Sequence, residues 1–145
     1  MRGLSGKAVI VTGGGGGIGT AACHRFVQEG AKVAVFDIDA DSAGRTAAQI
    51  TEAGGKAEAF ACDITEYAAC QKAVTAAEMA IGPIDILVNN AGWDVFRPFV
   101  ETSPSDWQKT ISINLTGALN MHHAVLPGMV ERQCGRIVNM KAPEQ

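Results

Sequence analysis

Residues 12–19, which read TGGGGGIG, constrain the fold of this chain more than any other stretch. They lie between a short apolar run at 8–11 and a helix-like run at 20–29. Because glycine lacks a Cβ, the backbone here can turn sharply and approach an anion, at which the first amides of the helix then point. Strand, glycine turn and helix in this order are typical of a dinucleotide-binding turn. A flexible linker is the alternative, but linkers are rarely bracketed by a strand and an amphipathic helix.

The next apolar run, residues 32–36, is short and valine-rich and ends at Asp37. Asp37 lies 18 residues beyond Gly19, close to the spacing of about 20 expected for an acid that accepts hydrogen bonds from the adenosine ribose. A carboxylate at this point repels the 2′-phosphate of NADP, and no basic residue occurs in the glycine turn or beside Asp37. The sequence therefore predicts NAD as the cofactor. The alternative is that Asp37 only ends a strand or caps the next helix.

Strand-like and helix-like segments alternate along the rest of the chain. We expect strands at 7–12, 32–36, 57–61, 84–88 and 136–140, and helices at 20–29, 41–53, 65–80 and from 104 onward. This alternation implies right-handed crossovers and a doubly wound parallel sheet. A length of 145 residues and a hydrophobic content of 47% suit a single α/β domain.

The last helix is expected to be long. Ser103 can cap it and Pro104 suits its first position. It would run through Asn114, with an interruption or a kink at Pro127 and Gly128.

Charge and composition exclude several classes of partner. The net charge is −3, and no basic cluster is interleaved with aromatic residues, so we expect no nucleic-acid or membrane partner. No apolar run approaches the length of a membrane span and no signal peptide is evident, which predicts a cytoplasmic protein. The four cysteines have no CxxC or Cys/His spacing, so we expect reduced thiols and no metal site.

Taken together, residues 7–140 resemble the short-chain dehydrogenase/reductase family. The motifs that carry the resemblance are TGGGGGIG at 12–19, Asp37, CDI at 62–64, NNAG at 89–92, INLTG at 113–117 and GRIVN at 135–139. The resemblance implies a Rossmann-type sheet with strand order 3-2-1-4-5, a nicotinamide dinucleotide cofactor and dehydrogenase activity.

The resemblance also implies roles for individual residues. Asp63 would hydrogen-bond the adenine amino group, with Ile64 packed beside it. Asn114 would bend its helix and hold a water molecule in the catalytic proton relay, the alternative being a satisfied core asparagine. The expected cofactor-binding residues are Thr12, Gly13, Gly15, Gly16, Gly17, Ile18, Gly19, Asp37, Ile38, Asp63, Ile64, Asn90, Ala91 and Gly92.

Within the family, residues 89–96, 115–118 and 122–129 are most similar to 2-hydroxycyclohexanecarboxyl-CoA dehydrogenases. This similarity implies that a secondary alcohol β to a thioester is oxidised by hydride transfer to NAD. The substrate would be a small acyl thioester or a related hydroxy or keto compound, and the complete enzyme would be a homo-oligomer. A 3-oxoacyl-carrier-protein reductase is the runner-up, although such enzymes often prefer NADP.

The sequence departs from the family after Met140. The family places a catalytic serine about two residues later, where this chain has Ala142, and its Tyr-x-x-x-Lys motif does not occur. The only tyrosine, Tyr67, is followed by Ala-Ala-Cys-Gln. General acid/base catalysis contributes about 10²–10⁴-fold, so we expect a nearly inactive chain, shortened by a frameshift, a premature stop or truncation. The alternative from a different class is a binding module that keeps dinucleotide affinity without turnover.

Two structural expectations follow. Gly17 and Gly19 should tolerate no side chain, because the backbone must approach the pyrophosphate and the helix must pack on the first strand, whereas residues 14–16 should be more forgiving. The strand at 136–140 and the helix around Asn114 should also leave apolar surface exposed, which predicts self-association.

Overall fold

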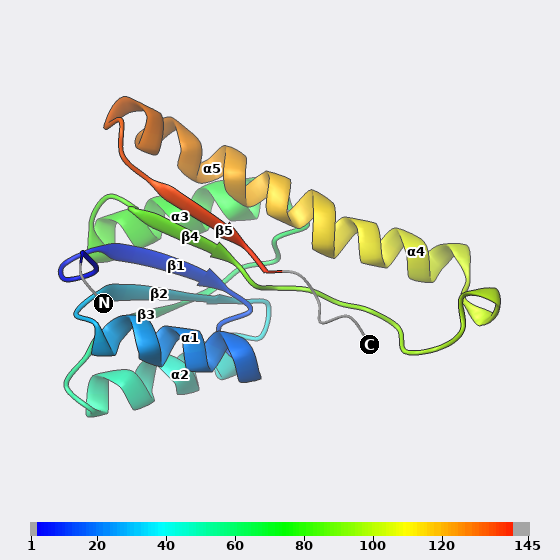
Figure 1. Cartoon of the computed structure of the whole chain (residues 1–145), viewed down its shortest axis with the longest axis horizontal. Helices are drawn as coiled ribbons and strands as arrows, with labels where there is room; N and C mark the ends of the chain where they lie inside the picture. The colour runs from blue at the N-terminus through cyan, green and yellow to red at the C-terminus, as the bar shows by residue number, and fades with distance from the viewer. Residues whose placement is uncertain (1–2, 141–145) are drawn as a thin grey trace.

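A parallel sheet of five strands forms the centre of the structure, which is a computed structural model that describes residues 3–140 (Figure 1). The strands are β1 (Ala8–Thr12), β2 (Lys32–Asp37), β3 (Lys56–Ala61), β4 (Ile86–Asn89) and β5 (Arg136–Asn139). Their order across the sheet is β3-β2-β1-β4-β5, and every neighbouring pair is parallel. This confirms the doubly wound sheet and the strand order that the sequence predicts.

The alternation of side chains along each strand divides the core into two layers. On one face of the sheet, Val9 and Val11 of β1 pack with Val33 and Val35 of β2 beneath α1 (Gly17–Gln28) and α2 (Ala40–Glu52). On the other face, residues such as Ile10 pack beneath α3 (Tyr67–Ile81) and α5 (Gly117–Glu131). Helices therefore cover both faces (Figure 1), which explains why the central strands β1, β2 and β4 are largely apolar and buried.

The helix α4 (Pro104–Ile111) begins where the sequence predicts. The Asp106 N–H donates to Ser103 Oγ at 3.4 Å, and the Ser103 N–H donates to Asp106 Oδ2 at 2.9 Å. These two hydrogen bonds form a capping box, which satisfies backbone donors at the helix start. A short 3₁₀ helix, Phe99–Glu101, precedes α4.

Of the interruption or kink expected at Pro127 and Gly128, the interruption is wrong. The helix α5 continues through both residues to Glu131. A proline removes one backbone donor from the ladder, and here Val125 and Met129, on either side of it, stay buried in the core. The irregular segment lies earlier, at Ser112–Thr116, which forms a π-helix between α4 and α5 and contains Asn114. The local distortion expected at Asn114 is therefore present.

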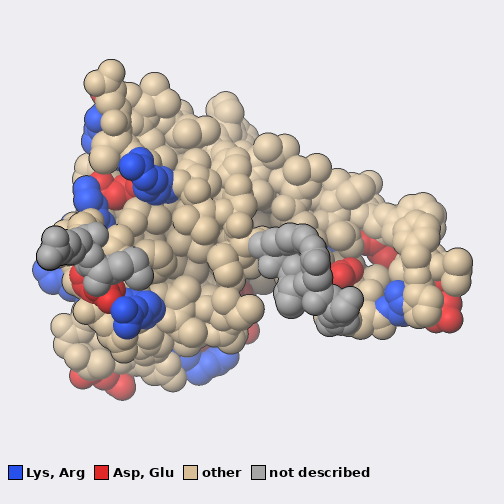
Figure 2. All heavy atoms as spheres, in the orientation of Figure 1, with Lys and Arg blue, Asp and Glu red and all other residues tan. Residues whose placement is uncertain are grey.

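The β5 strand lies at one edge of the sheet in the described part of the chain, and its Val138 is 44% exposed. The surface over α5 shows few charged groups, whereas charged side chains are visible at the end of the molecule near the N-terminus, along its lower edge and at the far end beside α4 (Figure 2). The large apolar side chains exposed along α4, the π-helix and α5 are Trp107, Ile111, Leu115, Leu119, Leu126 and Val130. Among the described residues, no helix is both long and apolar enough to span a bilayer.

Candidate functional site

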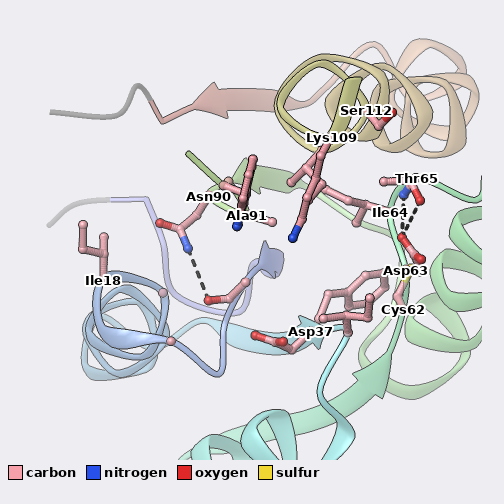
Figure 3. Close-up of a pocket in the computed structure, with 18 of the residues that line it drawn as sticks. Ile18, Asp37, Cys62, Asp63, Ile64, Thr65, Asn90, Ala91, Lys109 and Ser112 are labelled. Atoms are coloured by element: carbon pink, nitrogen blue, oxygen red, sulfur yellow. Dashed lines mark hydrogen bonds between the residues drawn. The ribbon is translucent and has the colours of Figure 1, made fainter. Parts of the chain in front are cut away.

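A cavity of about 820 Å³ opens at the carboxyl ends of the strands, where ligands bind in doubly wound sheets (Figure 3). Five segments that are separate in sequence form its walls. The lining residues are Gly13, Gly16, Gly17, Ile18, Gly19, Phe36, Asp37, Ile38, Cys62, Asp63, Ile64, Thr65, Asn90, Ala91, Gly92, Trp93, Lys109, Ser112 and Ile113. Of the fourteen cofactor-binding residues expected from the sequence, only Thr12 and Gly15 do not line this cavity.

The glycine turn brings the N-terminus of α1 to the cavity. Gly13 adopts a φ of 64°, and the Gly16 N–H donates to the Gly13 carbonyl oxygen at 3.2 Å. No side chain caps α1 at Gly16. The start of α1 therefore offers backbone amides and the positive end of a helix dipole to a ligand, which suits a phosphate group.

The space available for a Cβ at each glycine of the turn differs from what the sequence predicts. A Cβ on Gly19 would overlap the carbonyl oxygen of Gly13, as expected. A Cβ on Gly17 would meet no protein atom within 4 Å, so only a ligand in the cavity would contact it. The tolerance expected at residues 14–16 is wrong for two of them: a Cβ on Gly14 would lie 2.7 Å from Val35 Cγ1, and one on Gly15 would lie 2.6 Å from Ser42 Cβ. The turn packs directly on β2 and α2, which the sequence does not show.

The Asp37 carboxylate lies in the cavity wall and is held by two backbone amides. Its Oδ2 accepts the Gly15 N–H at 2.9 Å, and its Oδ1 accepts the Asp39 N–H at 3.0 Å. Gly15 thus contributes by fixing Asp37 rather than by facing the cavity. A carboxylate fixed in this way has lone pairs left for vicinal hydroxyl groups.

At the far end of the cavity, the segment after β3 is fixed by its own hydrogen bonds. Asp63 Oδ1 accepts the Thr65 N–H at 2.9 Å and the Thr65 hydroxyl at 2.7 Å. The Ile64 carbonyl accepts Asn120 Nδ2 at 2.8 Å, and its side chain packs against Gly117, where a Cβ would lie 2.6 Å from Ile64 Cγ1. The absence of a side chain at Gly117 therefore lets α5 approach this wall.

Thr12 and Asn90 join the glycine turn to the segment after β4. Thr12 is buried, and its Oγ1 accepts the Asn90 N–H at 3.1 Å and the Ala91 N–H at 3.0 Å. In return, Asn90 Nδ2 donates to the Thr12 carbonyl at 3.0 Å and to the Gly13 carbonyl at 3.3 Å. These bonds hold two walls of the cavity together, which gives both side chains a structural role.

A second cavity, of about 630 Å³, adjoins the first and contains Asn114, the expected catalytic residue. A polar chain also lines it: Asn89 Nδ2 donates to Asn139 Oδ1 at 2.9 Å, and His122 Nε2 lies 3.1 Å from the same oxygen. Asn89 is only 7% exposed, and its Oδ1 has no hydrogen-bond partner among the described residues. The sequence analysis did not predict this chain of polar side chains.

Lys109, Ser112 and Ile113 also line the first cavity and were missed in the sequence. Their spacing could have indicated that they lie together, because helix residues three and four apart share a face. Lys109 Nζ lies 4.1 Å from the centroid of the Trp93 ring, within reach of a cation–π interaction.

Tyr67 lies on α3 and lines neither cavity. Its hydroxyl lies 2.6 Å from His123 Nδ1. This position agrees with the expectation that Tyr67 does not replace the family tyrosine. Ala142 lies outside the described residues.

Comparison of the sequence with models of known protein families identifies the family of this chain. The family model described as short chain dehydrogenase matches residues 7–143. The chain belongs to the short-chain dehydrogenases. Two relatives illustrate this membership: 2-(S)-hydroxypropyl-CoM dehydrogenase 3 of Xanthobacter autotrophicus is 40% identical over 136 residues, and D-threitol dehydrogenase of Mycolicibacterium smegmatis is 42% identical over 137 residues. In both comparisons 94% of this chain is covered, but only 53% of the relative. The chain thus spans about half the length of these short-chain dehydrogenases.

Solved structures of short-chain dehydrogenases agree with the fold. An NAD⁺-bound xylitol dehydrogenase superposes with a TM-score of 0.90 at 34% identity, covering 95% of this chain and 54% of that one. A metagenomic short-chain oxidoreductase in complex with NADP gives a TM-score of 0.89 at 33% identity, covering 97% of this chain and 64% of that one. Similar structures therefore carry either nicotinamide dinucleotide.

Proposed function

We propose that this chain forms the cofactor-binding half of an NAD-dependent short-chain dehydrogenase that oxidises a secondary alcohol reversibly to a ketone. The observation that carries the proposal is the Asp37 carboxylate, fixed by the Gly15 and Asp39 amides in the wall of the larger cavity. Two vicinal ribose hydroxyls suit such an acceptor, whereas a 2′-phosphate would meet its negative charge. Membership of the family and the relatives' names support the reaction class.

The residues of the larger cavity fit a nicotinamide dinucleotide. Gly17 leaves space at the start of α1 that a side chain would fill, and the helix N-terminus there favours a pyrophosphate. Asp63 and Ile64 would hold the adenine, and residues 90–92 would line the adjoining ribose. When bound, the cofactor would accept a hydride from the substrate carbon. The contribution of this chain is to orient the dinucleotide with its nicotinamide toward the second cavity, where Asn114 lies.

For the substrate, we propose an acyl thioester that carries a secondary hydroxyl. The hydroxyl would lie either on a ring in the acyl group or at the β-carbon of an open acyl chain. A 3-oxoacyl-carrier-protein reductase remains the alternative within this chemistry. A polyol is a second candidate, because a D-threitol dehydrogenase and a xylitol dehydrogenase are among the similar proteins. We further propose that these 145 residues bind the cofactor with little or no turnover, because the sequence has no Tyr-x-x-x-Lys motif. In that case the chain by itself acts as a dinucleotide-binding module.

Fluorescence titration of the purified chain with NADH and with NADPH tests the cofactor proposal. We expect NADH to bind more tightly. Equal or tighter binding of NADPH would overturn the assignment of Asp37, and failure to bind either dinucleotide would overturn the function. In parallel, calorimetric titration of the NADH complex with 3-hydroxyacyl-CoA and with threitol compares the substrate classes. NADH formation in the presence of NAD⁺ and either alcohol would contradict the proposed lack of turnover.

A further inference from the structure

We propose that Lys109 is the counterion for the pyrophosphate of the bound dinucleotide. The inference rests on the proposed function and assigns a new specific contact to the same cavity. Lys109 belongs to α4, far in sequence from the glycine turn and from Asp37, and none of the sequence motifs includes it.

The charges of the cavity favour a cation beside a bound pyrophosphate. Two carboxylates, of Asp37 and Asp63, line the cavity, and Lys109 is the only basic residue among its described lining residues. A pyrophosphate brings two further negative charges into the same space. The amides at the start of α1 offset part of this repulsion, but they carry only partial charges. The Lys109 ammonium, in the wall opposite Asp37, supplies the full positive charge that the other lining residues lack.

The geometry holds the Lys109 ammonium at the cavity. Figure 3 shows the side chain directed from α4 into the cavity, on the side opposite Asp37. The Nζ atom rests 4.1 Å from the centroid of the Trp93 ring, and the Trp93 backbone is fixed by two hydrogen bonds to Asn114. Asp106, one helical turn before Lys109, is engaged by the N–H and hydroxyl of Ser103. The ammonium is thus placed by an aromatic ring and leaves its donors to a ligand.

The position of Trp93 favours the pyrophosphate over a 2′-phosphate as the partner. Trp93 follows Asn90 and Ala91, whose amides are bound to Thr12 at the glycine turn. The ammonium therefore belongs to the wall that adjoins the start of α1, where the pyrophosphate is expected. A 2′-phosphate would instead lie beside Asp37. Because the pyrophosphate is common to NADH and NADPH, Lys109 should strengthen the binding of both equally.

The variant Lys109→Met tests this inference, with Lys72→Met as a control, because Lys72 lies exposed on α3 and outside the cavity. We expect Lys109→Met to weaken NADH and NADPH by the same factor, roughly fivefold at low ionic strength for a partly exposed ion pair. The loss should shrink as salt is added, because salt screens exposed charges. ADP should lose affinity in the same way and adenosine should not. Lys72→Met should change none of these values.

Three results would overturn the inference: unchanged ADP and NADH affinities in Lys109→Met, a loss confined to NADPH, or an equal loss of adenosine binding. A loss confined to NADPH would assign the ammonium to the 2′-phosphate. Thermal unfolding of both variants checks that the fold is kept, and Lys109→Arg should retain most of the affinity if the fold is intact. If the unmodified chain binds no dinucleotide, the proposed function itself fails. If it binds and Lys109→Met binds equally well, only the role of Lys109 fails.

Discussion

The Asn114 side chain binds both backbone polar groups of Trp93. Its Nδ2 donates to the Trp93 carbonyl at 2.8 Å, and its Oδ1 accepts the Trp93 N–H at 2.8 Å. Asn114 lies in the π-helix, so the widened turn presents a polar side chain to a loop 21 residues earlier. This pair fixes the wall shared by the two cavities. The role in a proton relay, implied by the family resemblance, stays a prediction.

We predict that Asn114→Ala loosens the loop that carries Trp93. The two backbone groups lose their partner, and a typical intramolecular hydrogen bond contributes about 0.5–1.5 kcal/mol. Trp93 fluorescence in a Trp107→Phe background should shift toward that of an exposed tryptophan, and NADH affinity should fall. Asn114→Asp keeps the acceptor but not the donor, so it should give an intermediate result. An unchanged Trp93 spectrum in Asn114→Ala would contradict the proposed clamp.

Asp37→Ala should weaken NADH binding and narrow the difference between NADH and NADPH. Hydrogen bonds to a charged group contribute about 1.5–3 kcal/mol, so the loss should be roughly tenfold or more. Asp37→Asn is the matched control, because it removes the charge but keeps an oxygen acceptor for the Gly15 amide. Titration of each variant with both dinucleotides measures the effect. A constant ratio of the two affinities across the three proteins would show that Asp37 does not select the cofactor.

Substitutions at different glycines of the turn should affect either the stability of the fold or the binding of NADH. Gly19→Ala places a methyl group against the Gly13 carbonyl, and such overpacking costs about 1–3 kcal/mol or more. Gly17→Ala should leave the unfolding free energy nearly unchanged but weaken NADH binding, because its methyl group would enter the cavity. Gly44→Ala, in open space on α2, should stabilise the chain by about 0.5–1 kcal/mol. Urea denaturation and NADH titration together decide the outcome, and normal NADH affinity in Gly17→Ala would remove that position from the site.

The stability of the chain should fall at high pH. Burial raises the pKa of the Cys23 thiol from 9.0 to about 12. Above pH 9 the unfolded chain loses a proton that the folded chain keeps, so the free energy of unfolding falls as pH rises from 9 toward 12, by up to about 1.4 kcal/mol per pH unit. Cys23→Ala should reduce this slope in urea titrations, whereas replacement of the exposed Cys134 should not. An identical slope in Cys23→Ala would refute the assignment.

The isolated chain should self-associate through the apolar surface over α4 and α5. Leu119, Leu126 and Val130 are 55%, 41% and 68% exposed and share one side of α5, and apolar patches of this kind promote association. Leu126→Lys combined with Val130→Lys should lower the mass measured by light scattering. Met79→Lys is the control, because Met79 is exposed on α3, away from that surface. A monomeric mass for the unmodified chain at every concentration would contradict the prediction.

The central strands are predictable from the sequence because buried parallel strands leave a plain signal, whereas their order across the sheet was implied by the family resemblance. The valine-rich runs of β1 and β2 have no exposed face, and the turns between elements contain glycine. The irregularity in the last helix is not predictable in this way. Pro127 is a strong local signal for a break, but tertiary packing of α5 keeps the helix continuous. The π-helix, in turn, contains Asn114, whose contact with Trp93 is long-range.

For the site, the sequence identifies residues that lie in the turns directly after strands. Asp37 ends β2, Asp63 follows β3 and Asn90 follows β4, and the topology alone brings them to one edge of the sheet. Lys109 is different, because its place in the cavity depends on the direction of α4 relative to the sheet. The crowding at Gly14 and Gly15 likewise depends on how closely β2 and α2 approach the turn. Local sequence contains no information on the direction of α4 or on how closely β2 and α2 approach the turn.

The residues shared by the two cavities limit which substitutions can change one cavity without the other. Ile18, Ile64 and residues 90–93 line both cavities, so a substitution in any of them alters the dinucleotide site and the adjoining site together. Under the proposed function, only side chains that face the second cavity alone can change the substrate preference without altering the dinucleotide site. Phe96, Leu119 and His122 meet that condition. Libraries for changing specificity should vary these positions and leave the shared wall intact.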